Sequence, residues 1–178
     1  MLSIFHLNTY AQQNSTVDCT AGPVSTTFCY DTGSDNSYTF TSNDGTPLNL
    51  TIDVGQVENN WDELVIRDSD GTELYNGYGN AGDISGLTFQ SSGDTIEFEV
   101  VEDGSISCVS SGYTPITFTV SCATCINPQV NYEVVSDCLN APQFFVDVDV
   151  IDLGSAGSLT ISDNQGNSSS ATATGTIQ

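Results

Sequence analysis

Basic residues are nearly absent from this chain of 178 residues. It has no lysine, a single arginine, Arg67, and a single histidine, His6, against 23 aspartates and glutamates, which gives a formal net charge of −22. Such an acidic chain repels phosphate backbones and anionic lipid, which excludes nucleic-acid binding and direct binding to a membrane surface. The charge either serves solubility or forms a surface that recruits divalent cations or a basic partner.

Long apolar runs and helical patterns are absent too. No stretch approaches the ~20 apolar residues that cross a membrane, although hydrophobic residues make up 38% of the chain, enough for a core. The sequence instead shows apolar and polar residues in strict alternation over 48–54, 96–100, 116–122 and 146–150. Asp-Gly and Gly-Asp pairs lie between these runs. This pattern predicts an all-β protein with antiparallel strands, each with one buried and one solvated face, in a sandwich or barrel.

The N-terminal residues 1–13 resemble the end of a secretory signal peptide. A short apolar stretch leads to Ala11, a candidate cleavage point, but no basic segment precedes it. We therefore interpret this segment as the remnant of a longer leader and predict a secreted, extracellular protein. Cleavage would remove His6.

Catalytic chemistry finds little support in such a chain. Without lysine there is no lysine base or Schiff base, and without His6 there is no Ser-His-Asp or Cys-His arrangement. The tetrapeptide 31–34 (DTGS) occurs in the catalytic loop of aspartic proteases, but here it lies in ordinary turn-forming sequence. No pair among the 23 acids stands out as a glycosidase pair. The sequence therefore predicts a protein that is not an enzyme.

Two units are predicted after the leader. The first spans 18–122, and the second, 125–178, is interpreted as an incomplete β-sandwich or Ig-like repeat. The reason is an internal echo, because both 50–71 and 148–166 run from an alternating strand through an Asp-x-Gly corner to a second strand and an acidic turn. Chance repetition of simple hairpins is the alternative.

The cysteines predict disulfide bonds, because their number is even and the chain looks secreted. Six cysteines allow 15 pairings, among which the sequence does not choose. A zinc site is the alternative, since two of them form a C-x-x-C, but no histidine lies nearby to complete it. The six are Cys19, Cys29, Cys108, Cys122, Cys125 and Cys138.

Three segments of the first unit resemble a CUB domain, in the divergent form found in surface and secreted multidomain proteins of Bacteroidota. Residues 61–68 (WDELVIRD) are similar to the family's x-D-x-L-x-I-x-D-G strand, and residues 94–105 (DTIEFEVVEDGS) to L-x-V-x-F-x-S-D-x-S. Residues 113–120 (YTPITFTV) occupy the place of the closing strand. The resemblance covers about residues 19–122 and implies an antiparallel, jelly-roll β-sandwich.

The sequence departs from the family at several positions. The glycine of the first motif is delayed to Gly71, and Glu102 stands where the family usually has serine. Asn60 and Trp61 occupy the place just before the Asp motif where vertebrate members carry a cysteine. The family's disulfide scheme therefore does not carry over.

The resemblance also implies a calcium site. Many CUB domains hold calcium through a Glu before the Asp motif, the Asp of that motif and the Asp of S-D, which correspond here to Glu58, Asp62 and Asp103. Carboxylate oxygens are the ligands that calcium prefers, and three carboxylates on adjoining loops would repel one another without a cation between them. Solvated loop acids are the alternative interpretation. In such families the ordered loops capture a Lys or Arg of a partner.

The aromatic residues near this site allow two interpretations. Trp61, Tyr75 and Tyr78 could form a platform for a ligand. For Trp61, packing in the core or in an interface is preferred, because Leu64 and Ile66 follow it closely.

The leading functional hypothesis is a calcium-stabilised binding or adhesion module of a larger cell-surface or secreted protein, with a protein or glycan ligand. In Bacteroidota, similar modules form parts of adhesins and of proteins exported by type IX secretion. One alternative is a structural spacer without a ligand, which the internal echo favours. Another is a non-catalytic accessory domain of a secreted enzyme.

Overall fold

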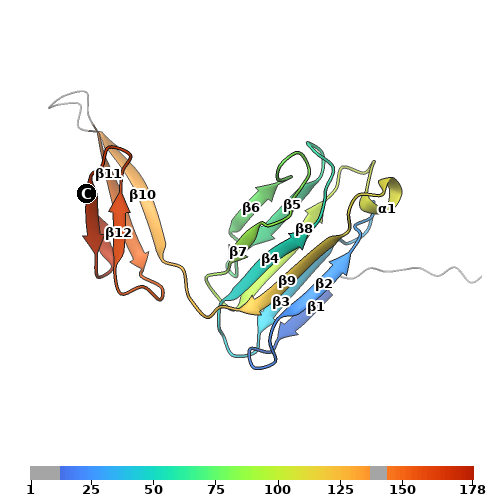
Figure 1. Ribbon diagram of the computed structural model, residues 1–178, viewed down its shortest axis with the longest axis horizontal. Helices are drawn as coiled ribbons and strands as arrows, with labels where there is room; N and C mark the ends of the chain where they lie inside the picture. Colours follow the sequence, from blue (N-terminus) through green and yellow to red (C-terminus); the bar gives the residue numbers. More distant parts are fainter. Residues whose placement is uncertain (1–12, 137–143) are drawn as a thin grey trace, which may run out of the picture. The chain divides into compact units, whose positions relative to one another are not determined.

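The computed structural model describes residues 13–136 and 144–178 (Figure 1). The chain divides into two compact units, Met1–Ala123 and Thr124–Gln178, which we call unit 1 and unit 2. Residues 1–12 of the predicted leader and Cys138 lie outside the described residues.

Unit 1 consists of two β-sheets. The larger has the order β1-β3-β8-β5-β6, with β1 (Gln13–Val17), β3 (Ser37–Ser42), β8 (Thr95–Val101), β5 (Glu63–Arg67) and β6 (Glu73–Gly77). The smaller has the order β2-β9-β4-β7, with β2 (Val24–Phe28), β9 (Ile116–Cys122), β4 (Leu48–Val54) and β7 (Thr88–Gln90). All pairs are antiparallel except β1 with β3. The predicted antiparallel β-sandwich is thus confirmed.

The alternating sequence builds the core between these sheets. Ile96, Phe98 and Val100 of β8 are buried, whereas the residues between them face outward. Phe98 stacks on Phe118 of β9, in the other sheet, with ring centroids 4.5 Å apart. Burial of one such side chain contributes about 1.5–3 kcal/mol, so the contacts between alternating faces hold the two layers together.

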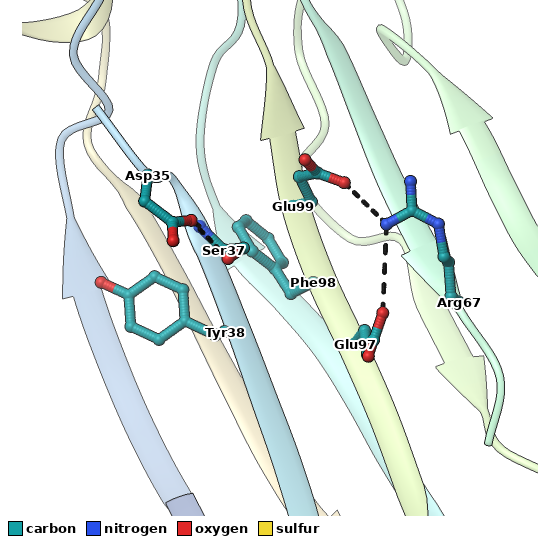
Figure 2. Close-up of a pocket in the computed structure, with 7 residues that line it drawn as sticks. All are labelled: Asp35, Ser37, Tyr38, Arg67, Glu97, Phe98 and Glu99. Carbon is teal, nitrogen blue, oxygen red and sulfur yellow. Dashed lines mark hydrogen bonds and ion pairs between the residues drawn. The ribbon is translucent and has the colours of Figure 1, made fainter. Parts of the chain in front are cut away.

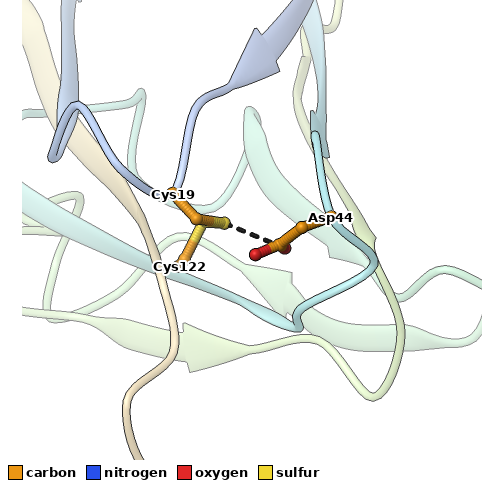
Figure 3. A group of neighbouring side chains, drawn as sticks. All are labelled: Cys19, Asp44 and Cys122. Atoms are coloured by element: carbon orange, nitrogen blue, oxygen red, sulfur yellow. Dashed lines mark hydrogen bonds between the residues drawn. A yellow bond between two sulfur atoms is a disulfide. The ribbon is translucent and has the colours of Figure 1, made fainter.

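Two disulfides bridge unit 1 near opposite ends of β9. Cys19–Cys122 ties the segment after β1 to the last residue of β9 (Figure 3). Cys29–Cys108 ties the end of β2, which pairs with the beginning of β9, to the one-turn helix α1 (Cys108–Ser111). Such bridges are typical of secreted and extracellular domains.

The C-x-x-C motif is not a zinc site in this structure. The Cys122 sulfur is bonded to Cys19, so it is not a thiolate ligand. Asp44 lies beside this bridge, with Oδ1 3.1 Å from the Cys19 sulfur (Figure 3). An oxidised sulfur carries no proton to donate, so this contact is a packing contact.

Unit 2 is a three-stranded sheet with a separate hairpin. The sheet has the order β10-β11-β14, with β10 (Gln129–Ser136), β11 (Phe144–Asp152) and β14 (Gly175–Ile177). The hairpin pairs β12 (Leu159–Ser162) with β13 (Ser168–Ala171). Of its described hydrophobic residues, Val148, Val150 and Ala171 are buried.

Across both described segments, 13–136 and 144–178, no helix has the length and apolar character of a membrane span.

Candidate metal centre

Glu58, Asp62 and Asp103 come together at one edge of the larger sheet, and we call them the acidic cluster. One carboxylate oxygen from each lies within 4.8 Å of the others. The reason is the register of β5 and β8, in which Glu63 pairs with Val101. Because these strands are antiparallel, the residue before β5 and the loop after β8 meet at the same edge. The structure therefore brings all three residues of the predicted site together.

Asp62 is the fixed member of the acidic cluster. Its side chain is fully buried, and each oxygen accepts a hydrogen bond. The Tyr30 hydroxyl donates to Oδ2 at 2.6 Å, and the Asp103 backbone N–H donates to Oδ1 at 3.1 Å. The second bond joins the two loops directly, so the Asp103 backbone is held beside Asp62.

Tyr30 is a residue of the site that the sequence analysis missed. It is fully buried, and its hydroxyl also accepts from the Glu58 backbone N–H at 3.1 Å. Burial, and then the hydrogen bond to Asp62, raise the pKa of Tyr30 well above its usual value. The phenol therefore stays protonated and remains a donor to Asp62. A buried tyrosine needs a partner for its hydroxyl, but nothing in the sequence indicates which carboxylate it meets.

Glu58 has an oxygen without a partner. Its Oε2 is buried and makes no hydrogen bond. Desolvation, followed by the charges of Asp103 and Asp62, raises the pKa of Glu58 above its ordinary value. A buried carboxylate oxygen without a donor is costly, so this atom is poised to accept a cation or a donor from outside the protein.

No basic side chain of unit 1 is available to supply that charge. Arg67 is the single Lys or Arg of the chain, and its Nη1 lies 2.6 Å from Glu99 and 4.0 Å from Glu97 (Figure 2). These residues border a depression of about 230 Å³ on the larger sheet, in which the arginine is already neutralised. Its lining residues are Asp35, Ser37, Tyr38, Arg67, Glu97, Phe98 and Glu99.

The acidic cluster fits a calcium ion on chemical grounds. Its donor set consists of oxygen alone, which suits calcium or magnesium and not zinc or copper. Calcium takes about six to eight oxygens at roughly 2.3–2.6 Å and accepts backbone carbonyls and water as further ligands. The unpartnered oxygen of Glu58 and the exposed carboxylate of Asp103 leave room for such an ion to bind.

Trp61 lies on the surface beside the acidic cluster. Its side chain is 64% exposed, so it is not a core residue, and the interface interpretation stays a prediction. Asn60, just before it, has a left-handed φ of 68°, which belongs to the turn that leads into β5. Tyr75 packs on Phe89 with ring centroids 5.4 Å apart, which makes it part of the sandwich packing.

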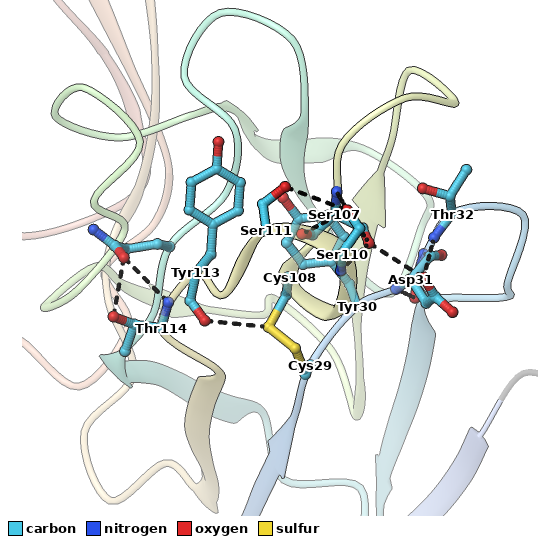
Figure 4. The surroundings of a disulfide bond; sticks show 12 residues. Cys29, Tyr30, Asp31, Thr32, Ser107, Cys108, Ser110, Ser111, Tyr113 and Thr114 are labelled. Atoms are coloured by element: carbon cyan, nitrogen blue, oxygen red, sulfur yellow. Dashed lines mark hydrogen bonds between the residues drawn. A yellow bond between two sulfur atoms is a disulfide. The ribbon is translucent and has the colours of Figure 1, made fainter.

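The DTGS segment forms a turn, as the sequence indicates. The Ser34 backbone N–H donates to the Asp31 carbonyl at 3.3 Å. The Asp31 carboxylate accepts from the Thr32 N–H and from the Ser107 hydroxyl (Figure 4). The aspartate therefore joins two loops.

No family model and no curated protein matches the chain. Among the solved structures that match is the full extracellular region of zebrafish Gpr126/Adgrg6, with a TM-score of 0.49 and 16% identity. The match covers 72% of this chain and 18% of that one, so the chain spans about a fifth of the receptor region. Another is the MASP-1 CUB2 domain bound to Ca²⁺, with a TM-score of 0.45, 15% identity, and coverage of 62% of this chain and 99% of that domain. Unit 1 is a two-sheet β-sandwich, and a CUB domain is among the solved structures to which the chain is similar.

Proposed function

We propose that unit 1 is a non-catalytic extracellular binding module that is stabilised by calcium, with Glu58, Asp62 and Asp103 as ligands of the ion. The observation that carries the proposal is the buried, unpartnered Oε2 of Glu58 within a group of three converging carboxylates. Hydrogen bonds account for both oxygens of Asp62, but they leave Glu58 and the mutual repulsion of the cluster without compensation. A divalent cation supplies both a partner and the opposite charge.

The same loops would present a surface to a partner. Trp61 is exposed between two of the proposed ligands, and exposed tryptophans often anchor interfaces. The acidic loops favour a partner that presents a Lys or Arg, on a protein or beside a glycan. This part of the proposal rests on the resemblance to CUB domains and on the charge of the chain.

Thermal unfolding of the full chain tests the calcium site. We expect the midpoint to rise by several degrees between EGTA and about 5 mM calcium, because ligand at ~100 times its Kd contributes about 2.7 kcal/mol. Magnesium, and sodium chloride of equal ionic strength, should give a smaller rise. A midpoint that does not respond specifically to calcium would remove the site and favour the structural spacer.

Asp103→Asn is the sharpest variant for this test. Asp103 is exposed and its Oδ1 accepts only from the Ser105 N–H and hydroxyl, which an asparagine oxygen also does. The fold should persist while calcium affinity, measured by calorimetry, falls at least about tenfold through loss of a charged ligand. Asp70→Asn is the matched control, since Asp70 is an exposed turn aspartate that bonds the Thr72 N–H in the same way. It should bind calcium as the wild type does.

A further inference from the structure

The Cys29–Cys108 bridge lies at the junction of the two segments that support the acidic cluster (Figure 4). Cys29 directly precedes Tyr30, and Cys108 follows Asp103 by five positions. Beside the bridge, the Val109 N–H donates to the Tyr30 carbonyl at 3.2 Å. Covalent and backbone bonds thus join the β2 end to the start of α1.

A side-chain contact reinforces the same junction. The Ser107 hydroxyl lies 3.2 Å from Asp31 Oδ1, and Ser107 is also the N-cap of α1. Ser107 is fully buried. The residue on each side of the bridge partner Cys108 is therefore bonded to the segment that follows β2.

Two arms lead from this junction to the acidic cluster. The first is the Tyr30 side chain, which bonds the Asp62 carboxylate and the Glu58 N–H. The second is the loop that leads back from Cys108 to Asp103, in which residues 103–106 are exposed. Because that loop has little burial of its own, its position depends on its two ends, which are β8 and the bridge.

We infer that the Cys29–Cys108 disulfide is a positioning element of the metal site, which holds Asp103 at the distance from Asp62 and Glu58 that an ion requires. The inference rests on the proposed calcium site. Opening the bridge releases one end of the exposed loop, so the ion must order the loop when it binds, and its affinity falls by that entropic cost.

The second disulfide provides a matched control within the same unit. Cys19–Cys122 closes a separation of 103 residues and Cys29–Cys108 one of 79. The entropic effect of a bridge depends on the logarithm of the loop length, so the two should stabilise the fold to a similar degree. Cys19–Cys122 lies near the other end of β9 and is bonded to none of the segments that carry the acidic cluster.

The experiment compares calcium affinity in the full chain by calorimetry. Cys29→Ala/Cys108→Ala is expected to weaken binding at least about tenfold relative to the wild type, whereas Cys19→Ala/Cys122→Ala should stay within about twofold. The emission of Trp61, the single tryptophan of the chain, gives a local readout of binding beside Asp62 in each variant. Equal weakening in both double variants would reduce the bridge to a general stabiliser and overturn the inference.

A further variant keeps both bridges and covers the case in which the first double variant does not fold. Two glycines inserted between Ser105 and Ile106 lengthen the exposed arm and separate Asp103 from the junction. Affinity should fall while circular dichroism and thermal stability without calcium stay near those of the wild type. Undiminished affinity in this variant would overturn the inference and leave the calcium site standing. Absence of calcium binding in the wild type would instead overturn the proposed function, and the inference with it.

Discussion

Strands β8 of unit 1 and β11 of unit 2 have the same pattern of sequence but different degrees of burial. In β8, valine and aromatic residues alternate with glutamates, and Val100 is 3% exposed. In β11, valines alternate with aspartates, yet Val146 is 39% exposed and Phe144 65% exposed. Alternation thus indicates which face of a strand is apolar, but a second layer must cover that face before it contributes to stability.

The covering layer differs between the two units. In unit 1 a four-stranded sheet lies over a five-stranded one. In the described part of unit 2 a two-stranded hairpin accompanies a three-stranded sheet, and a groove of about 720 Å³ remains, bordered by Tyr132, Phe144 and Val146. We therefore expect the core residues of unit 1 to be much more sensitive to mutation than similar residues of unit 2.

The largest contrast is expected when the same substitution is made in each unit. Phe98→Ala removes a fully buried ring and should cost unit 1 about 3–5 kcal/mol. Phe144→Ala removes an exposed ring and should change unit 2 by about 0.5 kcal/mol or less. Amide exchange of the full chain by mass spectrometry measures each unit separately, which a single melting curve does not. Similar losses in the two units would show that the groove of unit 2 is covered in solution.

Removal of a buried hydroxyl should have the next largest effect. Tyr30→Phe leaves the Asp62 oxygen and the Glu58 N–H without a partner and should cost about 1–3 kcal/mol, because both groups stay out of water. Tyr132→Phe is the control in unit 2, where the ring is 68% exposed, and should be near neutral. Amide exchange in β4 and β5 is the readout. An unchanged exchange rate there would mean that water replaces the hydroxyl.

The smallest effect is expected from the ion pair of unit 1, which unit 2 cannot match because it has no lysine or arginine. Arg67→Met, Glu99→Gln and the double variant form a cycle whose coupling energy should be about 0.2–1 kcal/mol, since both side chains are about a third exposed. The coupling should decrease with added salt. A coupling of zero at low salt would assign the contact no role in stability.

The sequence predicted those features that depend on local pattern. The alternation over 48–54 and 116–122 corresponds to β4 and β9 with the same bounds. The acidic cluster was predicted from two motifs, because residues before one strand and after its antiparallel neighbour meet at a sheet edge. Trp61 shows the limit of such reasoning, since Leu64 and Ile66 beside it are buried whereas its own side chain is exposed at a turn.

By itself, the sequence determined the fold class, the apolar face of each alternating strand and the acidic character of the loops, because these depend on residue type and on neighbours along the chain. Only the tertiary structure decided which cysteines pair, which carboxylate Tyr30 meets, and which apolar faces are covered. Each of these depends on contacts between segments far apart in sequence, such as Cys29 with Cys108 and Tyr30 with Asp62. Such contacts are set by how the two sheets pack, and that arrangement leaves no local signal in the chain.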